Sequence, residues 1–232
     1  MADTQLKGDP APIKDDPVKR LNRLDCCAVS DAMDKLGLKG GVSGLEQRAT
    51  TRRIAGRVVT YKLVPAGDAP KTSGPPRHLG TTAIEAAQPG EIIVVEQRTG
   101  IDAGSWGGIL SIGAKVRQVA GVIADGPVRD IDEARAYDFP IYCRSLTART
   151  ARSRVTEAFT NQPVTIGEIT VNPGDFAIAD ASGVVFIAAA DIERVLDAAE
   201  MIAGREAAMA KALLAGKPIS EVMGADYEHM LH

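Results

Sequence analysis

The sequence predicts an α/β fold built as a layered sandwich with a long C-terminal helix. Three observations support this prediction. Between residues 54 and 144, short apolar strands alternate with helical segments, which is typical of parallel strands covered by helices. Between residues 154 and 187, short strands are separated by turn-forming residues, which predicts antiparallel hairpins. Residues 190–215 are the longest helical stretch of the chain.

The first half of the chain is expected to begin with two helices that together form an amphipathic lid. These helices are predicted at residues 17–24 and 30–36, and Ser30 is the expected N-cap of the second. Further helices are predicted at 78–87, 108–120 and 131–137. Strands are predicted at 54–64, 91–96, 121–125 and 140–144, and the Gly- and Pro-rich segment 65–76 is predicted to be a surface loop.

The second half is expected to contain antiparallel strands at residues 154–159, 164–171 and 175–187, the last being interrupted by a turn. The helix at 190–215 has an apolar face that includes Val195, Leu196 and Ala199. At 1.5 Å per residue it would be ~38 Å long, which is more than a domain of this size needs. We therefore expect it to reach another subunit.

Composition and charge limit the possible functions. The 232 residues are expected to form a flexible N-terminal arm at 1–16 and a single domain at 17–232. A net charge of -3 with scattered basic residues argues against nucleic acid as a partner. No apolar run is long enough to span a membrane and the polar start lacks a signal sequence, so we expect a cytoplasmic protein. Cys26, Cys27 and Cys143 are expected to be buried or half-buried thiols.

The candidate site follows the strand predicted at 121–125. An Asp-Gly-Pro turn at 125–127 is expected to end that strand and to place Arg129 and Asp130 at the mouth of the fold. An unpaired ion in such a place costs several kcal/mol, so the pair is expected to bind something. The planar guanidinium of Arg129 suits carboxylate or enolate oxygens, and the carboxylate of Asp130 suits a hard cation such as Mg²⁺.

Two neighbouring features extend this site. A turn at 105–108 opens the next predicted helix, so free amides and the positive end of the helix dipole would face the same place and could bind a small anion. Glu133 lies one helical turn after Asp130, so both carboxylates could face one cation. Plain helix capping or a surface ion pair is the alternative explanation of the Arg129-Asp130 pair.

The residues of this candidate site are spaced as in a known family. Gly108, Arg129-Asp130 and Glu133, within the Trp-Gly-Gly and Gly-Val-Ile-Ala-Asp-Gly-Pro-Val-Arg-Asp segments, resemble the RraA-like family. That family includes the class II 4-hydroxy-4-methyl-2-oxoglutarate/4-carboxy-4-hydroxy-2-oxoadipate aldolases. The likeness extends to residues 29–37, 87–95, 172–175 and 179–185 and covers most of residues 18–215.

The resemblance implies a β/β/α sandwich of the swivelling-domain type, assembled as a homotrimer or a dimer of trimers with sites between subunits. It implies a metal-dependent lyase that uses Mg²⁺ or Mn²⁺. The implied reaction is retro-aldol cleavage of a 4-hydroxy-2-oxo acid to pyruvate through a metal-stabilised enolate, with oxaloacetate decarboxylase activity. The partners it implies are therefore a small 2-oxo acid and further copies of the chain.

The resemblance also implies a role for individual residues. Arg129 would stabilise the enolate and Asp130 would hold the metal, while Glu133 is added as a metal ligand from its spacing to Asp130. The substrate carboxylate would bind to the backbone amides of Gly107, Gly108, Ile109 and Leu110. A glutamate on the C-terminal helix of the adjacent subunit would complete the metal surroundings. Glu206 is the best match for that glutamate, and Glu200 is its rival.

One departure from the family pattern lies at Gly108, where many of these aldolases carry an aspartate that is thought to orient a water near the enolate. The proton relay is therefore unassigned in this chain. Glu133 could supply the missing negative charge, as in a subgroup that has glycine at the first position. We expect this chain to bind the metal as those aldolases do but to prefer a different substrate.

Two other functions stay open: a non-catalytic RraA-type regulator that binds protein partners, and a related lyase or hydratase that acts on another oxo acid. Among single residues, His78 and Arg77 could contact substrate, although structural roles are the plainer explanation. Trp106 is expected to pack beneath the Gly-Gly turn. Asp180 and Ser182 are explained by turn formation and are left out of the site.

Overall fold

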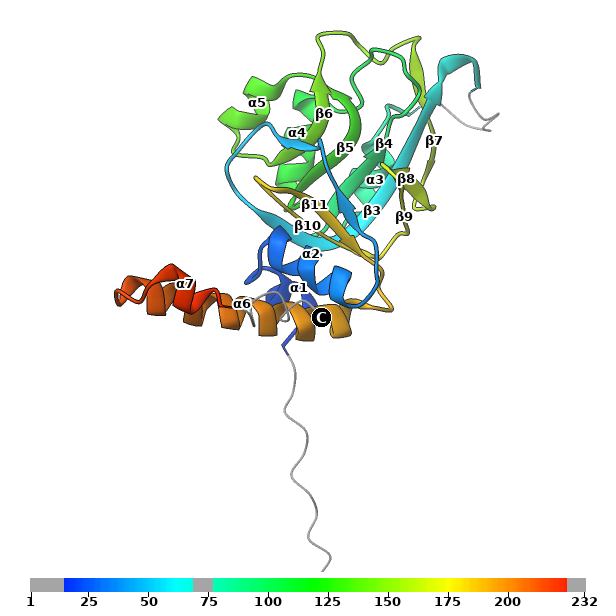
Figure 1. Ribbon diagram of the computed structural model, residues 1–232. Helices are drawn as coiled ribbons and strands as arrows, with labels where there is room; N and C mark the ends of the chain where they lie inside the picture. The colour runs from blue at the N-terminus through cyan, green and yellow to red at the C-terminus, as the bar shows by residue number, and fades with distance from the viewer. Residues whose placement is uncertain (1–14, 69–76, 225–232) are drawn as a thin grey trace, which may run out of the picture.

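The computed structural model describes residues 15–68 and 77–224 (Figure 1). Three segments lie outside the described residues: the expected arm up to residue 14, residues 69–76 of the expected loop at 65–76, and residues 225–232 at the end of the domain. Within the described ranges, nine strands form one sheet in the order β1-β11-β10-β3-β4-β5-β6-β2, with β7 paired to β3, and β8 and β9 form a separate hairpin. No helix in these ranges is long and apolar enough to cross a membrane.

The parallel part of the sheet confirms the alternation of strands and helices. The parallel strands are β3 (Ile54–Pro65), β4 (Ile92–Glu96), β5 (Gly121–Val128) and β6 (Ile141–Leu146). Their connections contain α3 (Thr81–Ala86), α4 (Gly108–Val116) and α5 (Ile131–Ala136). These helices cover one face of the strands, where Tyr61, Trp106 and Phe139 lie in a shared apolar core. The carboxyl ends of β4 and β5 therefore point toward the loops that precede α4 and α5.

The remaining strands are antiparallel, as the turn residues predict. They are β1 (Gly41–Val42), β2 (Glu46–Gln47), β7 (Val155–Thr160), β8 (Val164–Ile166), β9 (Ile169–Val171), β10 (Phe176–Asp180) and β11 (Gly183–Ile187). The long strand β3 joins both parts, because it pairs with β10 at its start, with β4 in its middle and with β7 at its end. A second core between the layers contains residues from β4, β8, β10 and β11.

The outer layer consists of α1 (Pro17–Leu21), α2 (Cys26–Lys35) and α6 (Ile192–Leu214). They enclose a third apolar core against β10 and β11, and α6 extends beyond the rest of the domain before the short α7 (Ile219–Val222) (Figure 1). A 3-10 turn spans Ala66–Asp68. The layered sandwich with a long C-terminal helix is thereby confirmed, and the two N-terminal helices belong to a packed layer.

The start of α2 was predicted wrongly. The helix begins at Cys26, because Asp25 is its N-cap and the carboxylate of Asp25 accepts a 2.8 Å hydrogen bond from the amide of Ala28. The expected cap, Ser30, lies inside the helix. An aspartate is as good a cap as a serine, and the buried residues Cys26 and Val29 extend the apolar face by one turn.

The segment predicted as one strand at 164–171 is the β8–β9 hairpin, which turns at Gly167 with a positive φ of 58°. Two buried carboxylates hold this hairpin on the sheet. Glu96 at the end of β4 accepts a 2.7 Å hydrogen bond from the amide of Thr165, and Asp125 in β5 accepts one of 2.7 Å from the amide of Gly167. Both carboxylates are also paired with cations, which offsets the cost of their burial.

Candidate active site

The carboxyl end of β5 differs from the predicted turn. The strand continues to Val128 through a bulge, since its pairing with β6 shifts register between Ala124 and Pro127. At Gly126 a Cβ atom would lie 2.6 Å from the carbonyl oxygen of Gln97, so the bulge requires glycine there. The bulge carries Arg129 and Asp130 past the sheet edge to the amino end of α5.

Hydrogen bonds tie this strand end to the loop before α4. The amide and the hydroxyl of Ser105 both donate to the carbonyl of Pro127 at 2.8 Å, and the amide of Arg129 donates to the carbonyl of Trp106 at 3.1 Å. The hydroxyl of Tyr61 donates to the carbonyl of Ser105 at 2.6 Å. Burial holds the pKa of Tyr61 well above its ordinary value, so this donor keeps its proton. The glycine turn and the charged pair are therefore held in one place.

Asp130 has an unusual backbone and an unusual partner. It adopts the left-handed conformation (φ 57°, ψ 40°) at the N-cap position of α5, and its side chain makes no capping hydrogen bond there. Its Oδ2 accepts a 3.1 Å hydrogen bond from the amide of Gly108, and its Oδ1 lies 3.2 Å from Nε of Arg129. Asp130 therefore does not cap its own helix; its carboxylate accepts from the first amide of the neighbouring helix α4 and pairs with Arg129.

These groups line one cavity of about 250 Å³. Its walls come from the glycine turn and the start of α4, from Arg129 and Asp130, from His78 and Leu79, and from residues 150–152. In the described part of the chain, the amides of Ile109 and Leu110 have no acceptor, and the terminal nitrogens of Arg129 have none either. The structure thus brings six of the predicted residues together: Gly107, Gly108, Ile109, Leu110, Arg129 and Asp130.

Glu133 lies beside this group, in the first turn of α5. A Cβ atom on Gly108 would lie 3.2 Å from Cβ of Glu133 and 3.3 Å from Cβ of Asp130, so both acidic residues approach the glycine closely. The Glu133 side chain is exposed and borders an adjoining cavity of about 440 Å³ that Arg129 and Asp130 also line. Two carboxylates suit Mg²⁺ or Mn²⁺, because a hard cation of this kind keeps several waters as further ligands.

No third metal ligand joins them within the described part of this chain, where no group of three His, Cys, Asp or Glu residues is placed to hold a metal. Glu206 lies on α6, at the other end of the domain from α4 and α5 (Figure 1). Burial and the nearby carboxylates of Asp25 and Asp31 raise the pKa of Glu206. Its role as a ligand from an adjacent subunit stays a prediction.

Glu200 is a poor rival because one guanidinium binds both of its oxygens in a bidentate ion pair, whereas Asp130 accepts one bond from a guanidinium nitrogen and one from a backbone amide. Nε and Nη2 of Arg20 donate to the two Glu200 oxygens at 2.8 and 2.7 Å, and the same guanidinium also binds Glu193 and Asp197. This hydrogen bonding outweighs burial and lowers the pKa of Glu200. The buried Arg20 thus joins α1 to three carboxylates of α6.

The other single residues follow their predicted roles in part. Trp106 is buried and stacked on Phe139, with ring centroids 6.3 Å apart, as expected for packing beneath the glycine turn. Arg77 is exposed and paired with Glu85. Cys26 and Cys143 are buried and burial raises the pKa of Cys143 to about 11, whereas Cys27 is exposed and its predicted burial was wrong.

Sequence reasoning missed part of the cavity wall. Thr150 and Arg152 line it from the loop between β6 and β7, and the Arg152 side chain has no acceptor among the described residues. The only signal in the sequence was the run of arginines at 149, 152 and 154, which does not show which of them faces the cavity.

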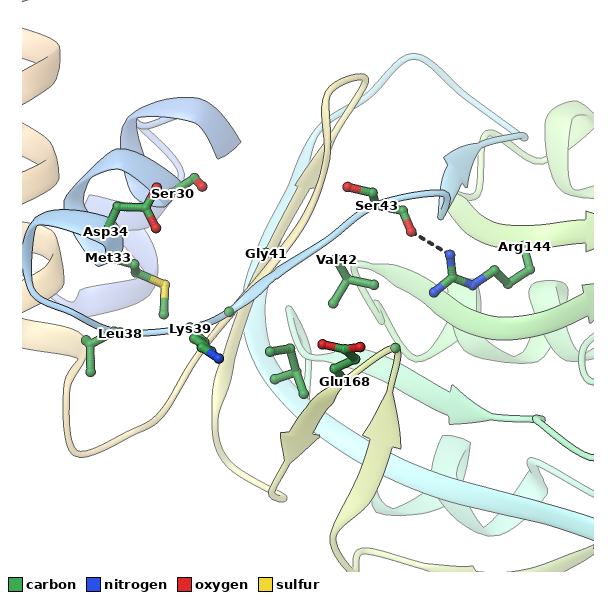
Figure 2. Close-up of a pocket in the computed structure, with 13 residues that line it drawn as sticks. Ser30, Met33, Asp34, Leu38, Lys39, Gly41, Val42, Ser43, Arg144 and Glu168 are labelled. Carbon is green, nitrogen blue, oxygen red and sulfur yellow. Dashed lines mark hydrogen bonds between the residues drawn. The ribbon is translucent and has the colours of Figure 1, made fainter.

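A larger cavity of about 480 Å³ lies between α2, β1 and the β8–β9 turn (Figure 2). Arg144 is directed into it, but its Nε binds Asp125 at 2.7 Å and its Nη1 binds the carbonyl of Ser43. The remaining charged side chains there, Asp34, Lys39 and Glu168, are exposed. This cavity therefore lacks the free guanidinium and free helix amides of the smaller one.

The glycine at position 107 offers a test of the site geometry. A Cβ atom there would lie 3.0 Å from Oδ2 of Asp130 and 3.5 Å from Cγ of Arg129, while the backbone (φ -153°) accepts any residue. We expect Gly107→Ala to displace the Asp130 carboxylate by a few tenths of an ångström and to lower turnover or the affinity for Mg²⁺ with oxalate by up to roughly 10-fold, less than the ~100-fold that a misplacement of about 1 Å can cost. Calorimetry and steady-state kinetics measure this loss.

Gly113→Ala is the matched control in the same helix, since its added Cβ would meet only Cδ1 of Ile84 at 3.9 Å. Gly113→Ala should leave both binding and activity unchanged. Equal losses in both variants would show that the helix as a whole, and not the charged pair, is sensitive to added volume.

Comparison with known proteins shows the family of the chain. The family model described as RraA-like, Aldolase/RraA, matches residues 26–186, which include the glycine turn, Arg129, Asp130 and Glu133. The chain belongs to the RraA-like family. The resemblance seen in the sequence is thereby confirmed.

Two relatives in this family show how far sequence similarity extends. Protein DlpA of Legionella pneumophila is 25% identical over 204 residues, which are 88% of this chain and 32% of DlpA, so the chain spans about a third of that relative. A Halalkalibacterium halodurans protein is 28% identical over 186 residues, which are 80% of this chain and 82% of the relative. Its name is "Putative 4-hydroxy-4-methyl-2-oxoglutarate aldolase".

Solved structures share the same fold. An uncharacterized protein from Pseudomonas syringae pv. tomato has a TM-score of 0.80 at 25% identity, covering 93% of this chain and 100% of its own. Streptomyces coelicolor RraAS2, described as an unusual member of the RNase ES inhibitor RraA protein family, has a TM-score of 0.71 at 24% identity, covering 85% of this chain and 97% of its own. The second likeness concerns the fold alone.

Proposed function

We propose that this RraA-like protein is a divalent-metal-dependent lyase. It cleaves a 4-hydroxy-2-oxo acid to pyruvate by a retro-aldol reaction and decarboxylates oxaloacetate. One observation carries the proposal: the guanidinium of Arg129, the carboxylate of Asp130 and the free amides of α4 line the same cavity. The aldolase name of the Halalkalibacterium halodurans relative, which is 28% identical to this chain, supports it.

The residues of the cavity supply binding and charge stabilisation. The amides of Ile109 and Leu110, at the positive end of α4, bind the substrate carboxylate, while Gly108 donates to Asp130. The terminal nitrogens of Arg129 donate to the 2-oxo oxygen, because Asp130 holds only Nε of this side chain. As negative charge develops on that oxygen, the two donors stabilise the pyruvate enolate.

Asp130 and Glu133 would hold Mg²⁺ or Mn²⁺, with Glu206 of an adjacent subunit as a further ligand. The bound metal would polarise the 2-oxo oxygen as a Lewis acid. We propose a homotrimer or a dimer of trimers, as the resemblance implies. Leu214 at the end of α6 and Ile219 in α7 are exposed apolar residues that a neighbouring subunit would cover.

Metal binding has a direct test in the wild-type protein. Mg²⁺ with oxalate, which mimics the pyruvate enolate, is expected to raise Tm by roughly 5–10 °C at about 100 times Kd, since a ligand that binds only the folded state stabilises it by about 2.7 kcal/mol. Asp130→Asn should remove this shift in a thermal melt. Asp132→Asn, at an exposed carboxylate two residues away, is the control and should retain it.

The reaction has its own test. A coupled assay for pyruvate, run on a panel of 4-hydroxy-2-oxo acids and oxaloacetate with and without chelator, should show turnover that depends on the metal. The RraA-type regulator is the competing function. A protein that binds a partner, yields no pyruvate and shows no shift with Mg²⁺ and oxalate would be a regulator and would overturn the proposal.

A further inference from the structure

The proposed aldol cleavage requires a base, and Gly108 offers no side chain for this role. Breaking the bond between C3 and C4 requires removal of the proton on the C4 hydroxyl, since that oxygen becomes a carbonyl. Decarboxylation of oxaloacetate requires no such step, because its C4 is already a carboxylate. An inference about the base therefore rests on the proposed function and can be tested separately from it.

The described side chains that line the cavity leave few candidates for this base. The carboxylate of Asp130 is bound by Arg129 and by the amide of Gly108, so it would lose both partners on taking a proton. Arg152 is a permanent cation, and the hydroxyl of Thr150 is not basic at neutral pH. Glu133 borders the adjoining cavity instead. His78, an exposed residue that lines the cavity, remains.

The contacts of His78 determine which of its nitrogens is basic. Nδ1 lies 3.0 Å from the carbonyl oxygen of Leu79, and a carbonyl can only accept a hydrogen bond, so Nδ1 carries the proton. Nε2 then holds the lone pair, and it has no partner among the described residues. The backbone is held as well, since the hydroxyl of Thr81 donates to the carbonyl of His78 at 2.7 Å.

We propose that His78 is the catalytic base of the aldol cleavage. Nε2 takes the proton of the C4 hydroxyl, and the bond between C3 and C4 breaks as C4 forms its carbonyl. The electron pair of that bond passes to C3 and gives the enolate beside Arg129. Water protonates C3 to complete pyruvate, and His78 returns its proton to the resulting hydroxide.

The test compares two reactions of one variant. His78→Gln keeps the polarity and approximate size of the side chain but cannot act as a base. We expect it to lower kcat for aldol cleavage about 100-fold, within the range typical of general bases, and to leave oxaloacetate decarboxylation within twofold. Added imidazole should restore part of the aldol activity of His78→Ala. Arg77→Ala, at the exposed neighbouring residue, should leave both reactions unchanged.

Each other outcome has a defined meaning. Equal losses of both activities in His78→Gln would show that His78 binds or positions substrate and would overturn its role as the base. Full retention of aldol cleavage would also overturn that role. Absence of both activities in the wild-type protein would overturn the proposed function itself, whereas a selective effect on aldol cleavage would support both.

Discussion

Arg129→Ala is expected to lower kcat/KM for pyruvate release on the order of 10³- to 10⁴-fold. The guanidinium and the cation together stabilise the transition state by roughly 4–6 kcal/mol, and each 1.36 kcal/mol is tenfold in rate. Groups that act as a unit on one oxygen are not additive, so removing the guanidinium alone is expected to cost most of this. The effect should be large because Arg129 lies in a cavity where its terminal nitrogens have no other acceptor among the described residues. Steady-state kinetics at saturating Mg²⁺ measure it.

Two further variants separate charge from geometry. Arg129→Lys keeps the charge but loses the planar fork, so we expect an intermediate loss. Arg135→Ala removes an exposed arginine of α5 that pairs with Asp132, and it should leave turnover unchanged. If Arg129→Ala kept near-full turnover with excess Mg²⁺, the guanidinium would have no part in the reaction and the proposed function would be wrong.

Arg20→Met is expected to cause the largest loss of stability, about 2–4 kcal/mol at pH 7. The guanidinium is only 6% exposed and binds Glu193, Asp197 and Glu200 at 2.7–2.9 Å, so its removal leaves three neighbouring carboxylates without their shared cation. These carboxylates are 40–52% exposed, so water partly solvates them, and the expected loss of stability is smaller than for a fully buried network. Urea unfolding at constant protein concentration measures the loss.

The same variant has a defined pH dependence. The hydrogen bonds from Arg20 lower the pKa of Glu200, so the pair contributes stability above the ordinary glutamate pKa of about 4.3. This contribution is lost as the pH falls through the lowered pKa. The difference in unfolding free energy between the wild-type protein and Arg20→Met should therefore be largest near neutral pH and should shrink below about pH 4.

Arg23→Met is the matched control, because Arg23 is 67% exposed and pairs with the exposed Asp15. Its replacement should change stability by less than about 1 kcal/mol. A loss in Arg23→Met as large as that in Arg20→Met, or a difference that did not shrink in acid, would contradict the assignment of this stability to the buried pairing.

Much of the fold could be predicted because it depends on local sequence patterns such as apolar runs and glycine turns. The Ile-Ile-Val-Val run of β4 and the apolar strand that starts at Gly121 are buried within the parallel sheet, as continuous apolar runs predict. The glycine turn before α4 and the spacing to Arg129 and Asp130 likewise predicted that these residues share a site. Their placement in one cavity agrees with that prediction.

The errors arose where two signals of similar strength competed. Asp25 and Ser30 are both good N-caps, and tertiary contacts favour the earlier start of α2: Cys26 packs against β10 and β11, and its amide donates to Asp180 at 2.9 Å. The Asp-Gly-Pro sequence is typical of a turn, yet β6 continues beside it and pairs with Pro127 and Val128. A bulge replaced the turn because a neighbouring strand was available.

The sequence by itself determined the apolar periods of the helices and strands, the glycine turn and the identity of the charged residues, since these depend on neighbours within a few positions. The tertiary structure alone decided which partners these residues meet. Asp130 accepts a hydrogen bond from the amide of Gly108 and does not cap α5. Arg20 pairs with Glu200, and His78 lines the same cavity as Arg129. Such contacts join residues far apart in the chain, and their geometry exists only after the layers have packed.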